Sequence, residues 1–148
     1  AFETVRGAGA EDVGGILELI RPLEEAGVLV KRSRELLENE VRHFSVIERD
    51  GSIIGCAALY PLADRAAELA CVAVHPDYQR NGRAARLLVE VEKRAQAQGI
   101  TTLYTLTTQT AHWFLERGFV ASTPDALPEP RKSLYNWQRN SKVFAKSL

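Results

Sequence analysis

A short apolar run followed by a glycine loop and a helical pattern constrains the fold of this sequence most. Residues 72–76 read Val-Ala-Val-His-Pro, the loop at 79–84 contains Gly82, and apolar residues then recur at helical spacing up to Ala95. A glycine loop at the start of a helix exposes backbone N–H groups and the positive end of the helix dipole, where phosphate binds readily. The loop lacks the patterns of nucleoside-triphosphate and dinucleotide sites, and a glycine before a helix also occurs in connections that bind nothing. The residues alone therefore fit either a phosphate-binding loop or an ordinary connection between a strand and a helix.

The length and charge of the chain limit the number of its domains and the kinds of partner that it can attract. Its 148 residues suffice for one domain over 1–148. Nineteen basic residues balance nineteen acidic ones, so no overall field attracts nucleic acid or an anionic membrane. No apolar run approaches the roughly 20 residues of a membrane span and no secretion signal is evident, so we expect a cytoplasmic protein. The chain begins at Ala1 and contains no methionine, which indicates a piece, or a short form, of a longer polypeptide.

Alternating strand-like and helical patterns predict an α/β fold. Asp50-Gly51 between two strand-like runs predicts an antiparallel hairpin, because glycine tolerates the positive φ of a tight turn. The run at 66–74 is almost wholly apolar after Glu68, which is typical of a central strand covered on both faces. The proline-rich stretch 122–130 predicts a connector without regular structure, of a kind that often borders a site. We expect strands at 2–6, 43–49, 53–60, 66–74, 101–107 and 119–121, a strand or strand pair at 133–148, and helices at 11–26, 33–41, 84–98 and 109–117.

Residue types that bind metals or attack thioesters are sparse. Cys56 and Cys71 lie in strand-like runs, where we expect small buried side chains; a disulfide or a nucleophilic cysteine is the alternative. The three histidines are scattered and lack acidic or thiol partners at ligand spacing, so no metal site is predicted. The basic residues at 31–34 form either a solvated loop or an anion-binding wall before the second helix.

Two short motifs resemble those of a known family. Gln79-x-x-Gly82-x-Ala84 resembles motif A of the GCN5-related N-acetyltransferases (GNAT), and residues 113–119 resemble the second GNAT signature, a short helix that ends in Gly-Phe. The resemblance implies an α/β (α+β) GNAT fold with a mixed, mostly antiparallel central sheet flanked by helices. It also implies acetyl-coenzyme A as cosubstrate, with its pyrophosphate on the motif A amides, its pantetheine on the preceding strand, and no metal. The positions implied are Cys71, Val72, Ala73, Val74, Gln79, Arg80, Asn81, Gly82, Arg83 and Ala84.

Longer stretches are similar to the acetyltransferase domain of the bacterial N-acetylglutamate synthases. Among them are residues 29–35, 70–78 and the ending at 139–142, Arg-Asn-Ser-Lys. This resemblance implies attack of the α-amine of L-glutamate on the acetyl thioester, the first step of arginine biosynthesis. Members of that family usually carry an N-terminal amino-acid-kinase-like domain that binds arginine. Nothing of that domain is present in this sequence, so arginine control cannot be assumed, and such a domain in a longer natural chain is the partner that the resemblance implies.

Roles for single residues follow from this reaction. Glu68, at the start of the central strand, where the family often keeps its base, is the candidate catalytic base, and an ordinary strand-entry glutamate is the alternative. Two carboxylates on the substrate require clamps, for which Arg32 and Arg139 are the candidates because a guanidinium makes two parallel hydrogen bonds to a carboxylate. Ser141 can add a hydroxyl two residues after Arg139 on the same strand face, and Lys31 is a weaker candidate.

Phe114 stands where many family members place a tyrosine that protonates the leaving thiolate. Tyr104, Tyr135 or a water could supply this proton, or the thiolate could leave unaided, because a thiol with a pKa near about 8.5 is a tolerable leaving group. Phe114 keeps open a non-catalytic domain that binds acetyl-coenzyme A. An acetyltransferase for another small amine or a protein N-terminus is the second alternative.

Overall fold

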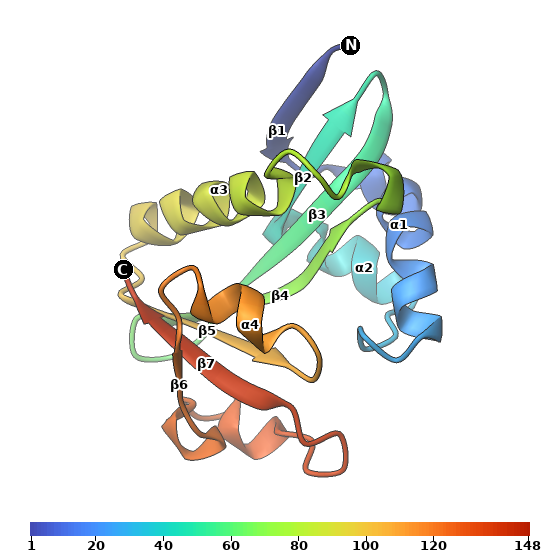
Figure 1. Cartoon of the computed structure of the whole chain (residues 1–148). Helices are drawn as coiled ribbons and strands as arrows, with labels where there is room; N and C mark the ends of the chain where they lie inside the picture. Colours follow the sequence, from blue (N-terminus) through green and yellow to red (C-terminus); the bar gives the residue numbers. More distant parts are fainter. The chain divides into compact units, whose positions relative to one another are not determined.

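The computed structural model describes residues 1–148, which form two compact units (Figure 1). The first unit comprises residues 1–58 and 71–92, and the second comprises residues 59–70 and 93–148. None of the helices combines the length and the apolar character that crossing a membrane requires.

The strands and α-helices follow the predicted order along the chain. The strands are β1 (Glu3–Gly7), β2 (Phe44–Arg49), β3 (Ser52–Pro61), β4 (Ala66–Val74), β5 (Thr102–Thr107), β6 (Val120–Ala121) and β7 (Lys142–Ser147). The α-helices are α1 (Val13–Glu25), α2 (Arg34–Glu40), α3 (Arg83–Ala97) and α4 (Ala111–Leu115).

The first unit is built on the strand order β1-β2-β3-β4. β1 pairs with β2, and β2 with β3, in antiparallel register. The hairpin between β2 and β3 confirms the turn prediction: Asp50 and Gly51 have φ of 48° and 87°. Leu37 of α2 is fully buried, whereas Leu36 is 42% exposed, because neighbouring helix residues point about 100° apart. The fully buried apolar side chains of this unit include Ile16, Ile20, Leu37, Val46, Ile47, Leu87 and Val91.

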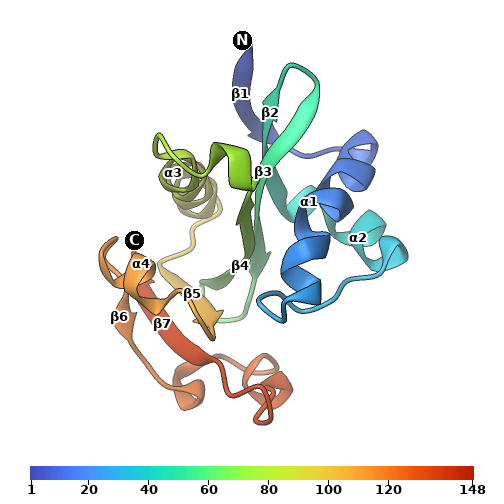
Figure 2. The ribbon, with the colours of Figure 1, turned by 45° about the vertical axis from the view of Figure 1, so that its right-hand side comes forward.

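The second unit continues from the first half of β4 with the order β4-β5-β7-β6. β4 runs parallel to β5, whereas β5 with β7 and β6 with β7 are antiparallel. Figures 1 and 2 show β5, β7 and β6 side by side. Leu127 of the connector packs with Tyr135 and Val143 in a small apolar cluster that Tyr104 and Leu106 border. These pairings confirm the predicted mixed, mostly antiparallel sheet flanked by helices.

The end of the chain differs from the prediction of a long strand from residue 133. A 3-10 helix covers Lys132–Leu134, and only β7 is extended. Between them, the Asn136 side chain accepts hydrogen bonds from the N–H groups of Gln138 and Arg139 at 3.0 and 3.1 Å, and Asn140 has a φ of 52°. Asparagine side chains that bond to the nearby backbone replace strand pairing with a turn. Likewise, the proline-rich connector holds one 3-10 turn, because proline suits the first position of a helix.

A carboxylate surrounded by three guanidinium groups fastens β1 within the first unit. Glu3 accepts hydrogen bonds from Arg49 at 2.9 Å, from Arg83 at 2.9 Å and from Arg86 at 2.6 Å. We call these four residues the Glu3 network. The Arg83 hydrogen bond is the main cause that lowers the pKa of Glu3 to about 2; burial opposes this shift, and Arg49 and Arg86 add to it.

This pKa predicts an acid-sensitive contribution to stability. Because the folded-state pKa of about 2 lies below the ordinary value of 4.5, Glu3 stabilises the fold fully above pH 4.5 and loses this effect as the pH falls toward 2. Between about pH 5 and about pH 3, the wild type should lose about 2 kcal/mol more unfolding free energy than Glu3→Gln. Urea denaturation at both pH values measures the difference, and parallel losses in the two proteins would contradict the prediction.

Two adjacent glycines in α1 offer a matched test of packing. A Cβ on Gly15 would lie 2.8 Å from Cγ1 and 3.1 Å from Cβ of Ile53, whereas one on Gly14 would meet no atom within 4 Å. Since the Ile53 Cβ is fixed by the backbone of β3, Gly15→Ala should lower the unfolding free energy by roughly 1–3 kcal/mol. Gly14→Ala should be neutral or raise it by up to about 1 kcal/mol. Urea denaturation of both variants checks this, and equal changes would argue against the clash.

Candidate functional site

The loop between β4 and α3 is shaped by its own backbone and by one histidine. The His75 ring nitrogen accepts the Asp77 N–H at 3.1 Å, and the His75 carbonyl accepts the Tyr78 N–H at 2.8 Å, so β4 ends in a 3-10 turn. Asn81 and Gly82 follow with φ of 70° and 71°. A left-handed residue beside a right-handed helical one, as Gly82 is to Arg83 at the start of α3, turns successive N–H groups toward one concave side where an anion can bind. Gly82 supplies a conformation that most side chains disfavour.

The surroundings of the loop leave room for a ligand. A Cβ on Gly82 would meet no atom within 4 Å, so the space beside the glycine is open. Gln79 is exposed, but its Nε2 donates to the Val74 carbonyl at 3.2 Å and closes the loop onto the end of β4. The backbone of this loop, with Ala84 in the first turn of α3, therefore remains the part suited to bind a diphosphate.

Two of the three arginines near the loop are bonded to a carboxylate. The Arg83 side chain is only 11% exposed and belongs to the Glu3 network, and Arg86 also bonds to Glu3. Arg80 is exposed at the loop surface. Sequence reasoning missed Glu3, because nothing in a short strand indicates a partner 80 residues away.

The second half of β4 carries a local distortion. Cys71 has a φ of 55°, an unusual backbone conformation within a strand, and is followed by Val72, Ala73 and Val74 in alternating half-buried and buried positions. The Cys56 thiol donates to the Cys71 carbonyl at 3.3 Å. Hydrogen bonding with the Cys71 thiol and complete burial raise the pKa of Cys56, so it stays protonated. Both cysteines are free and buried, which confirms the prediction of small buried side chains.

Glu68 lies in the first half of β4, opposite Tyr104 of β5, in the second unit. Arg131 donates from Nε to Oε1 of Glu68 at 2.6 Å and from Nη2 to Oε2 at 3.4 Å. The Glu68 side chain is 13% exposed and the Arg131 side chain is 22% exposed. Sequence reasoning missed Arg131 itself, although it placed the connector before Arg131 at the border of a site.

The remaining candidates of the second unit lie in the turn before β7. Arg139 and Ser141 were expected on one strand face, but they belong to the turn that Asn136 organises. Ser141 is 8% exposed, and its carbonyl accepts a hydrogen bond from the Tyr135 hydroxyl at 2.5 Å. The Tyr104 hydroxyl donates to the Ala126 carbonyl at 3.0 Å. Both tyrosines that could protonate a leaving group thus hold backbone segments in this structure.

Phe114 of α4 is 5% exposed and packs edge to face against Trp113 and Phe119. Its side chain offers no hydroxyl that could donate a proton.

In the first unit, Lys31 and Arg32 lie just before α2. The Ser33 hydroxyl accepts the Leu36 N–H at 3.1 Å and caps the start of this helix. The backbone N–H of Arg32 donates to Glu24 at 2.7 Å, and its guanidinium donates to the Val30 carbonyl at 3.1 Å. The loop is therefore held in place with its cations at the start of α2.

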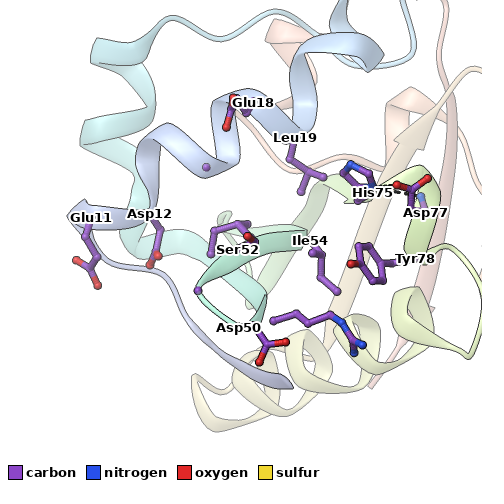
Figure 3. A pocket seen from close by; sticks show the side chains of 14 residues that line it. Glu11, Asp12, Glu18, Leu19, Asp50, Ser52, Ile54, His75, Asp77 and Tyr78 are labelled. Atoms are coloured by element: carbon purple, nitrogen blue, oxygen red, sulfur yellow. Dashed lines mark hydrogen bonds and ion pairs between the residues drawn. The ribbon is translucent and has the colours of Figure 1, made fainter. Parts of the chain in front are cut away.

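A groove of about 790 Å³ in the first unit involves none of the predicted site residues. Figure 3 shows side chains of the chain segment around the start of α1 on one side and His75, Asp77 and Tyr78 on the other. Its lining is rich in carboxylates, which repel phosphate, so we do not place a diphosphate there. The acidic residues that line it are Glu11, Asp12, Glu18, Asp50 and Asp77.

Comparison with known proteins agrees with this geometry. The chain is 62% identical over 148 residues to the amino-acid acetyltransferase of Pseudomonas aeruginosa strain PAO1 and covers 34% of that protein's length. Its fold matches N-acetylglutamate synthase from Neisseria gonorrhoeae complexed with coenzyme A and N-acetyl-glutamate, with a TM-score of 0.95 and 45% identity, over 100% of this chain and 35% of that one. The same synthase complexed with coenzyme A and L-arginine matches with a TM-score of 0.89 and 43% identity, over 100% of this chain and 34% of that one.

The chain thus spans about a third of the length of the relatives it matches. Residues 15–119, which include the β4–α3 loop and the Gly-Phe signature, match the Acetyltransferase (GNAT) family. The chain belongs to this family.

Proposed function

We propose that this chain transfers the acetyl group of acetyl-coenzyme A to the α-amine of an amino acid, and that the amino acid is L-glutamate. The observation that carries the proposal is the β4–α3 loop, with its left-handed Asn81-Gly82 pair at the start of a 15-residue helix. Its support is the likeness, over the full chain, to a synthase whose structure holds coenzyme A and N-acetyl-glutamate. The activity would be that of the first step of arginine biosynthesis.

The donor would bind along the second half of β4 and the loop that follows. Residues 79–84 would hold the diphosphate with backbone N–H groups and with the positive end of α3. The backbone of residues 71–74 would hold the pantetheine as an added strand and polarise the thioester oxygen. The open space beside Gly82 fits such a ligand.

Glu68 would receive the proton that the α-ammonium of glutamate loses. The amine nitrogen then forms a bond to the acetyl carbon and the carbon–sulfur bond breaks. The nitrogen loses its second proton to become the amide, and coenzyme A leaves as a thiolate that takes up one proton in exchange. Arg131 occupies one side of the Glu68 carboxylate. Because a carboxylate has about four lone-pair positions, it can still accept a hydrogen bond from water or from the amine. Arg131 would thereby orient the base.

The two carboxylates of glutamate would be bound by Arg32 and Arg139, with Ser141 and Lys31 as further donors. Guanidinium groups suit this task because each makes two parallel hydrogen bonds to a carboxylate. An N-terminal amino-acid-kinase-like domain, as in the family that the sequence resembles, would complete the longer natural protein.

Two alternatives remain. One is a domain that binds acetyl-coenzyme A without catalysis, which Phe114 and the two occupied tyrosine hydroxyls favour. The other is transfer of the acetyl group to another small amine or to a protein N-terminus. Arg32 and Arg139 argue against this alternative, because their positive charges suit an acidic substrate.

The deciding measurement is thiol release from acetyl-coenzyme A in the presence of each amino acid in turn. Glutamate should give the fastest release, ahead of aspartate and glutamine. Arg139→Ala should raise the KM for glutamate roughly tenfold or more, because a charged hydrogen bond is lost. Lys132→Ala, which removes a half-exposed cation of the same segment, serves as control and should leave it unchanged. If no amine gives thiol release, only the non-catalytic binding domain remains, and equal rates with glutamine and glutamate would dismiss the two-carboxylate clamp.

The role of Glu68 is tested by Glu68→Gln. Loss of the base should lower kcat for glutamate by on the order of 10²–10⁴ while the KM for acetyl-coenzyme A stays unchanged. Glu116→Gln, which alters an exposed carboxylate of the same unit, is the matched control. Steady-state kinetics of both variants give the answer, and a kcat close to that of the wild type would exclude Glu68 as base.

A further inference from the structure

We propose that Glu3 on β1 is a positioning residue for the diphosphate loop, acting through Arg83. The inference rests on the proposed function of that loop. A carboxylate such as Glu3 is unexpected beside a loop that would bind a diphosphate, because like charges repel.

The Arg83 side chain holds the loop by donating hydrogen bonds to its backbone carbonyls. Its Nη1 donates to the Tyr78 carbonyl at 3.3 Å and to the Arg80 carbonyl at 3.2 Å. Its Nε and Nη2 donate to the Glu3 carboxylate at 3.2 and 2.9 Å. The side chain is 11% exposed, so the guanidinium has few donors left for a ligand. Arg83 therefore shapes the loop rather than contacting the phosphates.

The two carbonyl contacts fix the direction of the loop amides. In a trans peptide, the C=O of one residue and the N–H of the next point in opposite directions. Holding the Tyr78 and Arg80 carbonyls toward Arg83 therefore turns the N–H groups of Gln79 and Asn81 away from it. Gly82, which is left-handed, and Arg83, the first helical residue of α3, then present further N–H groups on one concave side, where an anion can bind.

Glu3 is what keeps Arg83 in this place. A nearly buried guanidinium requires a charged partner, and the Glu3 carboxylate is aligned for it because Glu3 pairs with Arg49 in the β1–β2 register. The Tyr78 ring lies between Arg49 and Arg83, 5.3 and 5.2 Å from their guanidinium carbons. Without Glu3, Arg83 would gain by turning toward water or toward the ligand, and the two carbonyls would be released.

The negative charge of Glu3 does not cancel the attraction of the loop for phosphate. The Glu3 network contains three guanidinium groups and one carboxylate, so its sum stays positive. Glu3 therefore orders the loop while the field around it still favours anions.

The test compares two acyl donors, acetyl-coenzyme A and S-acetylpantetheine, which lacks the diphosphate. Glu3→Gln should lower kcat/KM for acetyl-coenzyme A about tenfold or more, and weaken coenzyme A binding in calorimetry by a similar factor, because misplaced binding groups lose much of their effect. The same variant should change kcat/KM for S-acetylpantetheine by less than about twofold. Equal losses with both donors, or coenzyme A binding as tight as in the wild type, would overturn the proposal.

Two further variants keep the test decisive. Arg83→Lys leaves β1 intact but removes the guanidinium fork, so it should weaken coenzyme A in the same way even where Glu3→Gln does not fold. Glu48→Gln is the matched control, because Glu48 accepts a comparable bond from Arg6 at 2.5 Å in the same unit but does not touch the loop. Its coenzyme A affinity should stay within about twofold of the wild type. A wild type that binds no coenzyme A would instead refute the proposed function itself.

Discussion

Guanidinium groups that bond to carboxylates and backbone carbonyls hold the irregular parts of this chain in place. Arg83 does so for the loop before α3, and Arg131 joins its own segment to Glu68. Arg65 donates to the Gly99 carbonyl at 3.1 Å, next to the turn that ends α3. Loop backbone cannot pair with a strand, so its carbonyls need donors of this kind. The helices and strands depend on the burial of apolar side chains, but the placement of the proposed site depends on these guanidinium hydrogen bonds.

Glu68 and Glu3 would have different roles in the proposed chemistry. Glu68 must remain able to accept a proton, whereas Glu3 is tied so strongly by cations that its pKa falls to about 2. The two differ in their partners. Glu3 meets three guanidinium groups, and Glu68 meets Arg131 alone among the arginines. Three guanidinium partners and the low pKa that they cause make Glu3 a carboxylate of fixed structure.

Local patterns were sufficient to predict most of the fold. The Asp50-Gly51 turn and the apolar run of β4 each depend on neighbouring residues, and the structure confirms both. The final strand was predicted too long, because the turn at Asn136 depends on side-chain bonds to the backbone, which periodicity does not reveal. The pairings of Glu3 with Arg83 and of Glu68 with Arg131 join residues 80 and 63 positions apart, so only the folded chain discloses them. The loop itself could be found from Gly82 and the helix after it, but what holds the loop could not.

The low pKa of Glu3 has a consequence for the electrostatics of the loop. Arginine side chains stay protonated at any physiological pH, and Glu3 stays ionised down to about pH 2. The charge of the Glu3 network is therefore constant across the range in which cells live. Any change in ligand affinity with pH in that range must originate outside this network, in the ionisation of the ligand's own phosphates or of other side chains.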